Sequence, residues 1–155
     1  MSKTKFVAEP GRQEITMTRV FDAPRERVFA AHTDPKSIPL WWGPRRLTTI
    51  VDKLEARKGG MWRFVQHDKA GNEYAFHGVY HESLAPERIV RTFEYEGTPG
   101  HVLLETTIFE NIDGKTKVTA QSVFQSLEAR DGMLKSGAEG GAVETWDRLE
   151  ELLQA

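Results

Sequence analysis

The chain has 155 residues, 39% of them hydrophobic, 28% charged and none of them cysteine, which predicts one globular domain and excludes disulfides, thiolate metal sites and a cysteine nucleophile. Its formal net charge of −2, without a block of like charges, argues against nucleic acid or an anionic membrane bound by bulk electrostatics. No segment resembles a membrane span or an apolar signal region, so we expect a cytoplasmic protein without membrane insertion.

The N-terminal part of the chain predicts a lead-in, one strand and two helices. Residues 1–12 form a loose lead-in, and residues 13–155 form a single domain. Within that domain, apolar residues alternate over residues 13–21, which predicts a strand. Two helix start signals follow at once, Asp22-Ala23-Pro24 and Thr33-Asp34-Pro35.

The second of these helices must be short. Pro39 lacks the N–H group that a helix interior needs. The helix ends in Trp41-Trp42-Gly43-Pro44, and two adjacent indoles cannot share one narrow helix face. We therefore expect at least one of these tryptophans to point into a groove or cavity.

A run of six further strands follows, joined by short turns. The strongest turn signal is Asp113-Gly114, which is typical of a two-residue hairpin. The predicted strands cover residues 47–56, 61–67, 74–81, 88–96, 101–112 and 115–125.

The period of the apolar residues changes to that of a helix from about residue 128 to residue 153. Its apolar stripe consists of Ala138, Ala142, Trp146, Leu149 and Leu153. Gly132 and Gly137 are expected to break a short leading helix from a long final one. Gly140 and Gly141 are expected to let the final helix approach another backbone closely.

These elements predict an α+β fold: a seven-stranded curved antiparallel sheet, two short helices after the first strand, and a long C-terminal helix. The apolar face of the sheet must be covered, and the final helix is the long amphipathic element that can cover it. A single helix does not reach every inward side chain of a curved sheet. We therefore expect a cavity between the two.

Several motifs resemble those of one known family. They are FDAPRERVF at residues 21–29, TDP at 33–35, WWGP at 41–44, Gly59-Gly60-x-Trp62, PERIV at 86–90 and ETWDRL at 144–149. Together they resemble the activator of heat-shock-protein-90 ATPase homologue-like family of the START and birch-pollen-allergen-like helix-grip superfamily. The resemblance runs from about Ile15 to Leu153, and its motifs are specific to a fold rather than to a reaction.

The resemblance implies a helix-grip fold whose cavity binds apolar or amphipathic small molecules. Relatives across the superfamily include lipid carriers, hormone receptors, polyketide cyclases and aromatases. The family often has Trp or Leu where this chain has His32, so we expect the inner end of the first helix to be locally polar here.

Aromatic side chains carry the main functional signal. Each one alone is explained more simply by core packing. Rings on several strands and on the final helix nevertheless predict, as a group, the lining of one concave ligand site. The group consists of Trp41, Trp42, Trp62, Phe64, Phe76, Tyr80, Phe93, Tyr95 and Trp146.

Ionisable residues on apolar faces add candidates to this lining. Arg19, Arg91 and Glu105 are in phase with apolar neighbours. They either lie at exposed strand ends, pair across the sheet, or face the cavity, where an arginine would hold a ligand carboxylate and a glutamate would transfer a proton. His32 either bonds to a backbone carbonyl at a helix end or forms a polar group at the cavity mouth beside Trp41 or Trp42.

Neither a metal nor a cofactor is expected. His77 and His81 point the same way on a predicted strand but lie roughly 13 Å apart at about 3.3 Å per residue, which is too far for one ion. The chain has no HExxH helix, no phosphate-binding glycine motif and no GxSxG elbow.

We therefore favour binding of a small apolar or amphipathic molecule, as a carrier, sensor or scavenger, over catalysis. One alternative is a cofactor-free cyclase, dehydratase or hydrolase, which needs a desolvated ionisable group facing inward near a tyrosine or histidine. Another is a protein-interaction module related to chaperone activators, which needs a contiguous exposed apolar patch. A homodimer and a protein partner both stay open.

Overall fold

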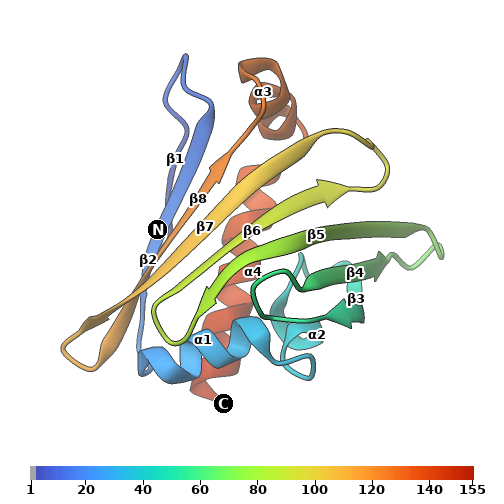
Figure 1. The fold of residues 1–155 in the computed structure, drawn as a ribbon. Helices are drawn as coiled ribbons and strands as arrows, with labels where there is room; N and C mark the ends of the chain where they lie inside the picture. The colour runs from blue at the N-terminus through green and yellow to red at the C-terminus, as the bar shows by residue number, and fades with distance from the viewer. Residues whose placement is uncertain (1–2) are drawn as a thin grey trace.

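Eight antiparallel strands form one curved sheet within residues 3–155, the part of the chain that this computed structural model describes (Figure 1). Their order across the sheet is β1-β2-β8-β7-β6-β5-β4-β3. The strands are β1 (Lys5–Val7), β2 (Glu14–Phe21), β3 (Thr48–Leu54), β4 (Met61–His67), β5 (Glu73–Leu84), β6 (Arg88–Tyr95), β7 (Val102–Ile112) and β8 (Lys115–Val123).

The prediction of seven strands was one strand short. β1 lies within residues 1–12, which we had assigned to a lead-in, and it pairs with β2 from Lys5 opposite Thr18 to Val7 opposite Thr16. Three residues are too few to reveal the alternating pattern of a strand, so pairing with β2 decides the structure of this segment. Residues 1–2 of the predicted lead-in lie outside the described residues.

The helices are α1 (Arg25–Thr33), α2 (Ile38–Trp41), α3 (Leu127–Lys135) and α4 (Ala138–Gln154). The long helix α4 crosses the concave side of the sheet, with α1 and α2 at one end of the sheet and α3 at the other (Figure 1). Gly137 precedes α4 with a φ of +88°, a conformation that glycine adopts without strain, and it separates α4 from α3. The other predicted break, Gly132, lies inside α3.

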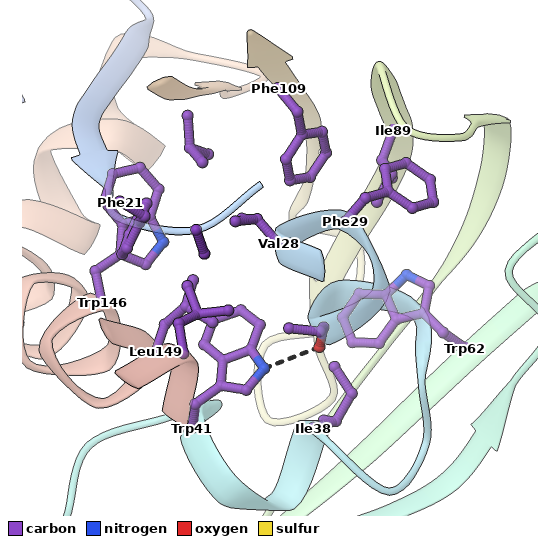
Figure 2. Packing of buried hydrophobic residues seen from close by; sticks show 14 of the residues in the cluster. Phe21, Val28, Phe29, Ile38, Trp41, Trp62, Ile89, Phe109, Trp146 and Leu149 are labelled. Carbon is purple, nitrogen blue, oxygen red and sulfur yellow. Dashed lines mark hydrogen bonds between the residues drawn. The ribbon is translucent and has the colours of Figure 1, made fainter. Parts of the chain in front are cut away.

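The main core fills the end of the concave side where α1 meets α4. Phe21 and Trp146 pack edge to face with ring centroids 5.6 Å apart, and Leu149 lies fully buried among them (Figure 2). The Trp41 indole donates a hydrogen bond of 2.9 Å to the Ala31 carbonyl, so this buried polar group is satisfied (Figure 2).

A second, smaller core lies under α3. Buried Ile15, Leu103 and Phe124 form it, and Met133 of α3 packs against them. The two cores therefore occupy opposite ends of the sheet, with the N-terminal part of α4 between them.

Gly140 and Gly141 do not serve a close backbone approach, so this prediction was wrong. A Cβ atom built on either glycine meets no atom within 4 Å. Gly140 faces solvent, and Gly141 faces a gap between α4 and the curved sheet. No helix among residues 3–155 combines the length and the apolar character that a membrane crossing requires.

Candidate functional site

A cavity of about 380 Å³ lies between the sheet and α4, and we term it the inner cavity. Strands β2, β4, β5, β6, β7 and β8, the helices and the loop after α2 contribute to its wall. It brings together eight of the residues that the sequence predicted as lining: His32, Trp41, Trp42, Phe76, Arg91, Phe93, Glu105 and Trp146.

The loop after α2 forms a fixed part of this wall. Gly43 has a φ of +95°, and a Cβ atom there would lie 2.0 Å from the Gln66 amide nitrogen. The Thr49 hydroxyl donates a hydrogen bond of 2.7 Å to the Trp42 carbonyl, and Arg148 of α4 donates one of 2.7 Å to the Gly43 carbonyl. These contacts hold the Trp42 ring at the cavity.

The main charged group of the inner cavity is an ion pair between neighbouring strands. Arg91 on β6 lies opposite Glu105 on β7 and Tyr80 on β5. Its Nε donates to the Glu105 carboxylate at 3.1 Å, and its guanidinium stacks over the Trp62 ring at 4.0 Å. Burial by itself would lower the pKa of Arg91, but the charge of Glu105 and the contact with Tyr80 raise that pKa above its usual value. Arg91 therefore remains a cation whose charge Glu105 balances.

His32 is the neutral polar group of the inner cavity. Its Nδ1 donates a hydrogen bond of 2.8 Å to the Val28 carbonyl, and its ring packs edge-on against Trp41 and Phe109. Burial lowers the pKa of His32 to about 4, with repulsion by Arg91 in the same direction, although the bond to Val28 opposes the shift. At neutral pH the imidazole is therefore uncharged, and its Nε2 is an acceptor. Both sequence interpretations of His32 describe it, since it bonds at the helix end and also lines the cavity.

Three predicted lining residues belong to the packed core instead. Trp62, Phe64 and Tyr80 are at most 1% exposed and lie behind the wall of the inner cavity. Trp42, which follows α2, packs edge-on against Trp62 and Phe64, and these two rings also pack against each other. These residues support Arg91 and Trp42 rather than line the cavity.

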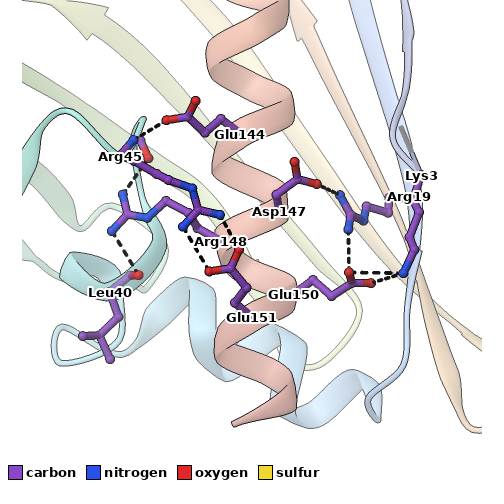
Figure 3. Close-up of polar contacts among 10 residues, drawn as sticks. Lys3, Arg19, Leu40, Arg45, Glu144, Asp147, Arg148, Glu150 and Glu151 are labelled. Atoms are coloured by element: carbon purple, nitrogen blue, oxygen red, sulfur yellow. Dashed lines mark hydrogen bonds and ion pairs between the residues drawn. The ribbon is translucent and has the colours of Figure 1, made fainter. Parts of the chain in front are cut away.

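Arg19 also lies outside the lining. It is buried, but its guanidinium turns to α4 and pairs with Asp147 at 2.6 Å and Glu150 at 2.9 Å (Figure 3). Asp147 and Glu150 lie outside the apolar stripe of α4, and the buried cation on β2 draws both into ion pairs.

A second cavity, which the sequence analysis missed, lies under α3. This outer cavity has a volume of about 420 Å³ and is lined by Leu103, Phe124 and Ala129, among others. Tyr95, predicted to line the cavity between the sheet and the final helix, lines this outer cavity instead. Phe93 and Met133 line both cavities. The apolar spacing of Ala129 and Met133 was a signal for it, since one face of α3 must cover apolar strand ends.

The inner cavity is suited to enclosing an apolar molecule and contacting one polar group on it. Besides the ion pair and His32, its polar lining consists of Gln66, Thr107, Ser122 and Thr145, which the sequence did not predict. Within residues 3–155, no three His, Asp or Glu side chains gather as a metal-binding group.

A family model described as "Activator of Hsp90 ATPase homolog 1-like protein" matches residues 22–154. No curated protein matches the chain in sequence.

Solved structures similar to this one come from several bacteria. A protein from Arthrobacter aurescens is 22% identical with a TM-score of 0.90, over 97% of this chain and 91% of that one. One from Rhodobacter sphaeroides is 24% identical with a TM-score of 0.89, over 97% and 98%. One from Staphylococcus epidermidis is 27% identical with a TM-score of 0.82, over 94% and 92%. These likenesses establish the α+β fold.

Proposed function

The chain belongs to the family of Activator of Hsp90 ATPase homolog 1-like proteins, and we propose that it binds a small, largely apolar molecule in the inner cavity, as a carrier, sensor or scavenger. The observation that carries the proposal is the cavity of about 380 Å³ between the sheet and α4, which aromatic side chains line. Cavities of this size and lining are typical of small-molecule sites. Burial of apolar ligand surface, at about 25 cal/mol per Å², would supply the driving force.

The polar groups would orient the bound molecule. The neutral His32 offers its Nε2 as an acceptor, and the paired Arg91 and Glu105 offer both donors and acceptors. An enclosed polar group without a partner is costly, so a ligand that bonds to these groups is favoured over a purely apolar one.

Two adjacent glycines of α4 provide a matched test. Gly141 lines the inner cavity and Gly140 is exposed, and both have open space at the Cβ position. Leucine at either position raises helix propensity by about 0.8 kcal/mol. We expect Gly141→Leu to weaken binding of 1-naphthol, a compact aromatic alcohol, at least tenfold, and Gly140→Leu to leave it unchanged. Fluorescence titration measures both, and native mass spectrometry gives the stoichiometry.

The proposal fails if 1-naphthol and a panel of compact apolar alcohols do not bind to the wild-type protein. It also fails if Gly140→Leu and Gly141→Leu weaken binding equally, because the molecule would then bind outside the inner cavity.

A cofactor-free acid–base enzyme is a second candidate. The observation that favours it is a carboxylate and a neutral imidazole, Glu105 and His32, in the lining of one cavity, with the Tyr80 hydroxyl behind the wall accepting from Arg91 at 3.5 Å. A carboxylate and an imidazole are common general bases. If this candidate is correct, Glu105→Gln abolishes turnover of a β-hydroxy ketone followed by NMR while 1-naphthol still binds. Turnover that survives Glu105→Gln would rule out this carboxylate as the base.

A further inference from the structure

The two cavities lie end to end along three neighbouring strands. On β6, Arg91 lines the inner cavity, Phe93 lines both and Tyr95 lines the outer one. Alternate residues of a strand share a face, so this row spans about 13 Å at about 3.3 Å per residue. Phe93 therefore lies between the two cavities and belongs to the wall of each.

The neighbouring strands repeat this order. On β7, Glu105 belongs to the inner cavity and Leu103 to the outer one, and they lie opposite Arg91 and Phe93 respectively. On β8 and just beyond it, Ser122 lines the inner cavity and Phe124 the outer one. Each row thus runs from a polar or charged residue to an apolar or aromatic one. The site has a polar end and an apolar end.

The junction between the cavities contains a movable side chain. Met133 of α3 lines both cavities, as Phe93 does, and an unbranched methionine adapts its shape to what lies beside it. The helix itself is held by polar contacts away from the cavities, where Arg130 donates to the Glu9 carbonyl at 2.6 Å. Met133 can therefore make room for a chain without displacement of α3.

The charges at the polar end are already balanced. Glu105 neutralises Arg91, and His32 is uncharged at neutral pH. A ligand carboxylate would add an unpaired negative charge next to Glu105, and a ligand ammonium would add a positive charge next to Arg91. A hydroxyl group has neither cost, because it donates to the Nε2 of His32 or to Glu105 and accepts from Arg91.

We propose that the ligand is an elongated, uncharged amphipathic molecule with a hydroxyl-type head beside Arg91, Glu105 and His32 and an apolar chain that passes Phe93 and Met133 into the outer cavity. This inference rests on the proposed function and names the ligand class of the same site.

Straight-chain 1-alkanols from hexanol to tetradecanol test the length of the site. Each buried methylene contributes about fourfold in affinity, so we expect the dissociation constant to fall by about this factor per carbon up to the length that fills the outer cavity, and then to level off. Competition with 1-naphthol, with each alkanol below its solubility limit, measures these constants.

A variant in the outer cavity tests whether the ligand chain enters that cavity. Ala129 lines the outer cavity but not the inner one. We expect Ala129→Leu to weaken dodecanol binding at least tenfold and to leave 1-naphthol binding unchanged. Gly140→Leu on the exposed side of α4 is the control and should change neither.

Head groups of equal chain length test the charge argument. At pH 7 we expect dodecanol to bind at least tenfold more tightly than dodecanoate or dodecylamine. If either dodecanoate or dodecylamine binds more tightly than dodecanol, the proposal of an uncharged head group is wrong.

The outcomes separate this inference from the proposed function. If 1-naphthol binds but longer alkanols bind no more tightly than hexanol, the proposal of an elongated ligand is wrong. The proposal of a compact ligand in the inner cavity then stands. If Ala129→Leu leaves dodecanol binding unchanged, the chain does not enter the outer cavity. If neither 1-naphthol nor any alkanol binds, both proposals fail.

Discussion

At the scale of single residues, His32 illustrates how burial sets the chemistry of a side chain. Packing against Trp41 and Phe109 removes water from the imidazole, and desolvation disfavours its charged form. At neutral pH the residue is therefore an uncharged hydrogen-bond acceptor, whereas an exposed histidine would be partly protonated.

His32 should make stability depend on pH. Its folded pKa of about 4 lies below the ordinary value of 6.5, so the unfolded chain takes up the proton first. The stabilisation is complete above pH 6.5 and is lost as the pH falls from 6.5 to 4, by up to about 3 kcal/mol. We expect His32→Phe to flatten this part of the profile of unfolding free energy, measured with urea. His81→Phe, at an exposed position, should keep the wild-type slope, and an unchanged slope in His32→Phe would contradict the prediction.

Arg91 and Glu105 stabilise the protein as a pair rather than singly. Their side chains are 14% and 27% exposed, so removal of one partner leaves the other charge poorly solvated. We expect Arg91→Met to lower the free energy of unfolding by about 3 kcal/mol. The double variant Arg91→Met/Glu105→Leu should recover more than half of that loss. A double variant as unstable as the sum of the single variants would show that the two charges act independently.

At the scale of elements, arginine side chains fix the position of α4 over the sheet. Arg19 of β2 pairs with Asp147 and Glu150, while Arg148 of α4 donates to the Leu40 and Gly43 carbonyls (Figure 3). From α1, Arg27 donates to the Leu152 and Leu153 carbonyls, where a helix end leaves acceptors free. The helix thus keeps its place although its N-terminal part spans a cavity.

Two neighbouring arginines at this interface should differ in their effect. Arg148 makes charge-assisted hydrogen bonds to backbone carbonyls of the cavity loop, and its loss should cost about 2 kcal/mol. The side chain of Arg45 is 52% exposed and pairs with Glu151, which is 61% exposed, so solvent screens this pair and its loss should cost less than the loss of Arg148. Urea unfolding of Arg148→Met and Arg45→Met compares them. Equal losses would mean that the contact with the loop is no stronger than the surface pair.

At the scale of the whole molecule, the N-terminal segment contributes to both layers. Its short strand β1 forms an edge of the sheet, and the residue Lys3 before it contacts α4. β1 pairs with β2, and Phe6 packs against the core under α3. Nearby, Lys3 reaches Glu150 on α4, which also binds Arg19 (Figure 3). The N-terminal segment is thus linked to both layers.

Deletion of residues 1–8 should therefore lower stability without abolishing the fold. We expect a loss of about 2 kcal/mol from the apolar surface of Phe6 and the pairing of β1, with a single cooperative transition retained. Lys3→Ala, which removes an exposed ion pair, should cost less than about 1 kcal/mol. Thermal and urea unfolding measure both, and a deletion variant as stable as wild type would show that β1 adds nothing to the sheet.

Local patterns were sufficient for most of the fold. The alternation over β4 and the helical stripe of α4 placed these elements within a few residues, and Asp113-Gly114 forms the predicted turn. The family resemblance, confirmed by the match over residues 22–154, agrees with the observed fold. β1 escaped prediction because only its pairing with β2 makes it a strand.

The sequence by itself determined which residues are apolar, where the chain turns, and that one helix must cover a curved sheet, since these follow from periodicity and turn chemistry between near neighbours. Only the tertiary structure decided that Arg19 faces α4 while Arg91 faces the cavity, and that Gly141 lines this cavity while Gly140 is exposed. Arg19 and Arg91 occupy equivalent positions in their strand patterns, but they point to different surroundings because their partners come from distant segments. That choice depends on the curvature of the sheet and the placement of the helix, which no local pattern encodes.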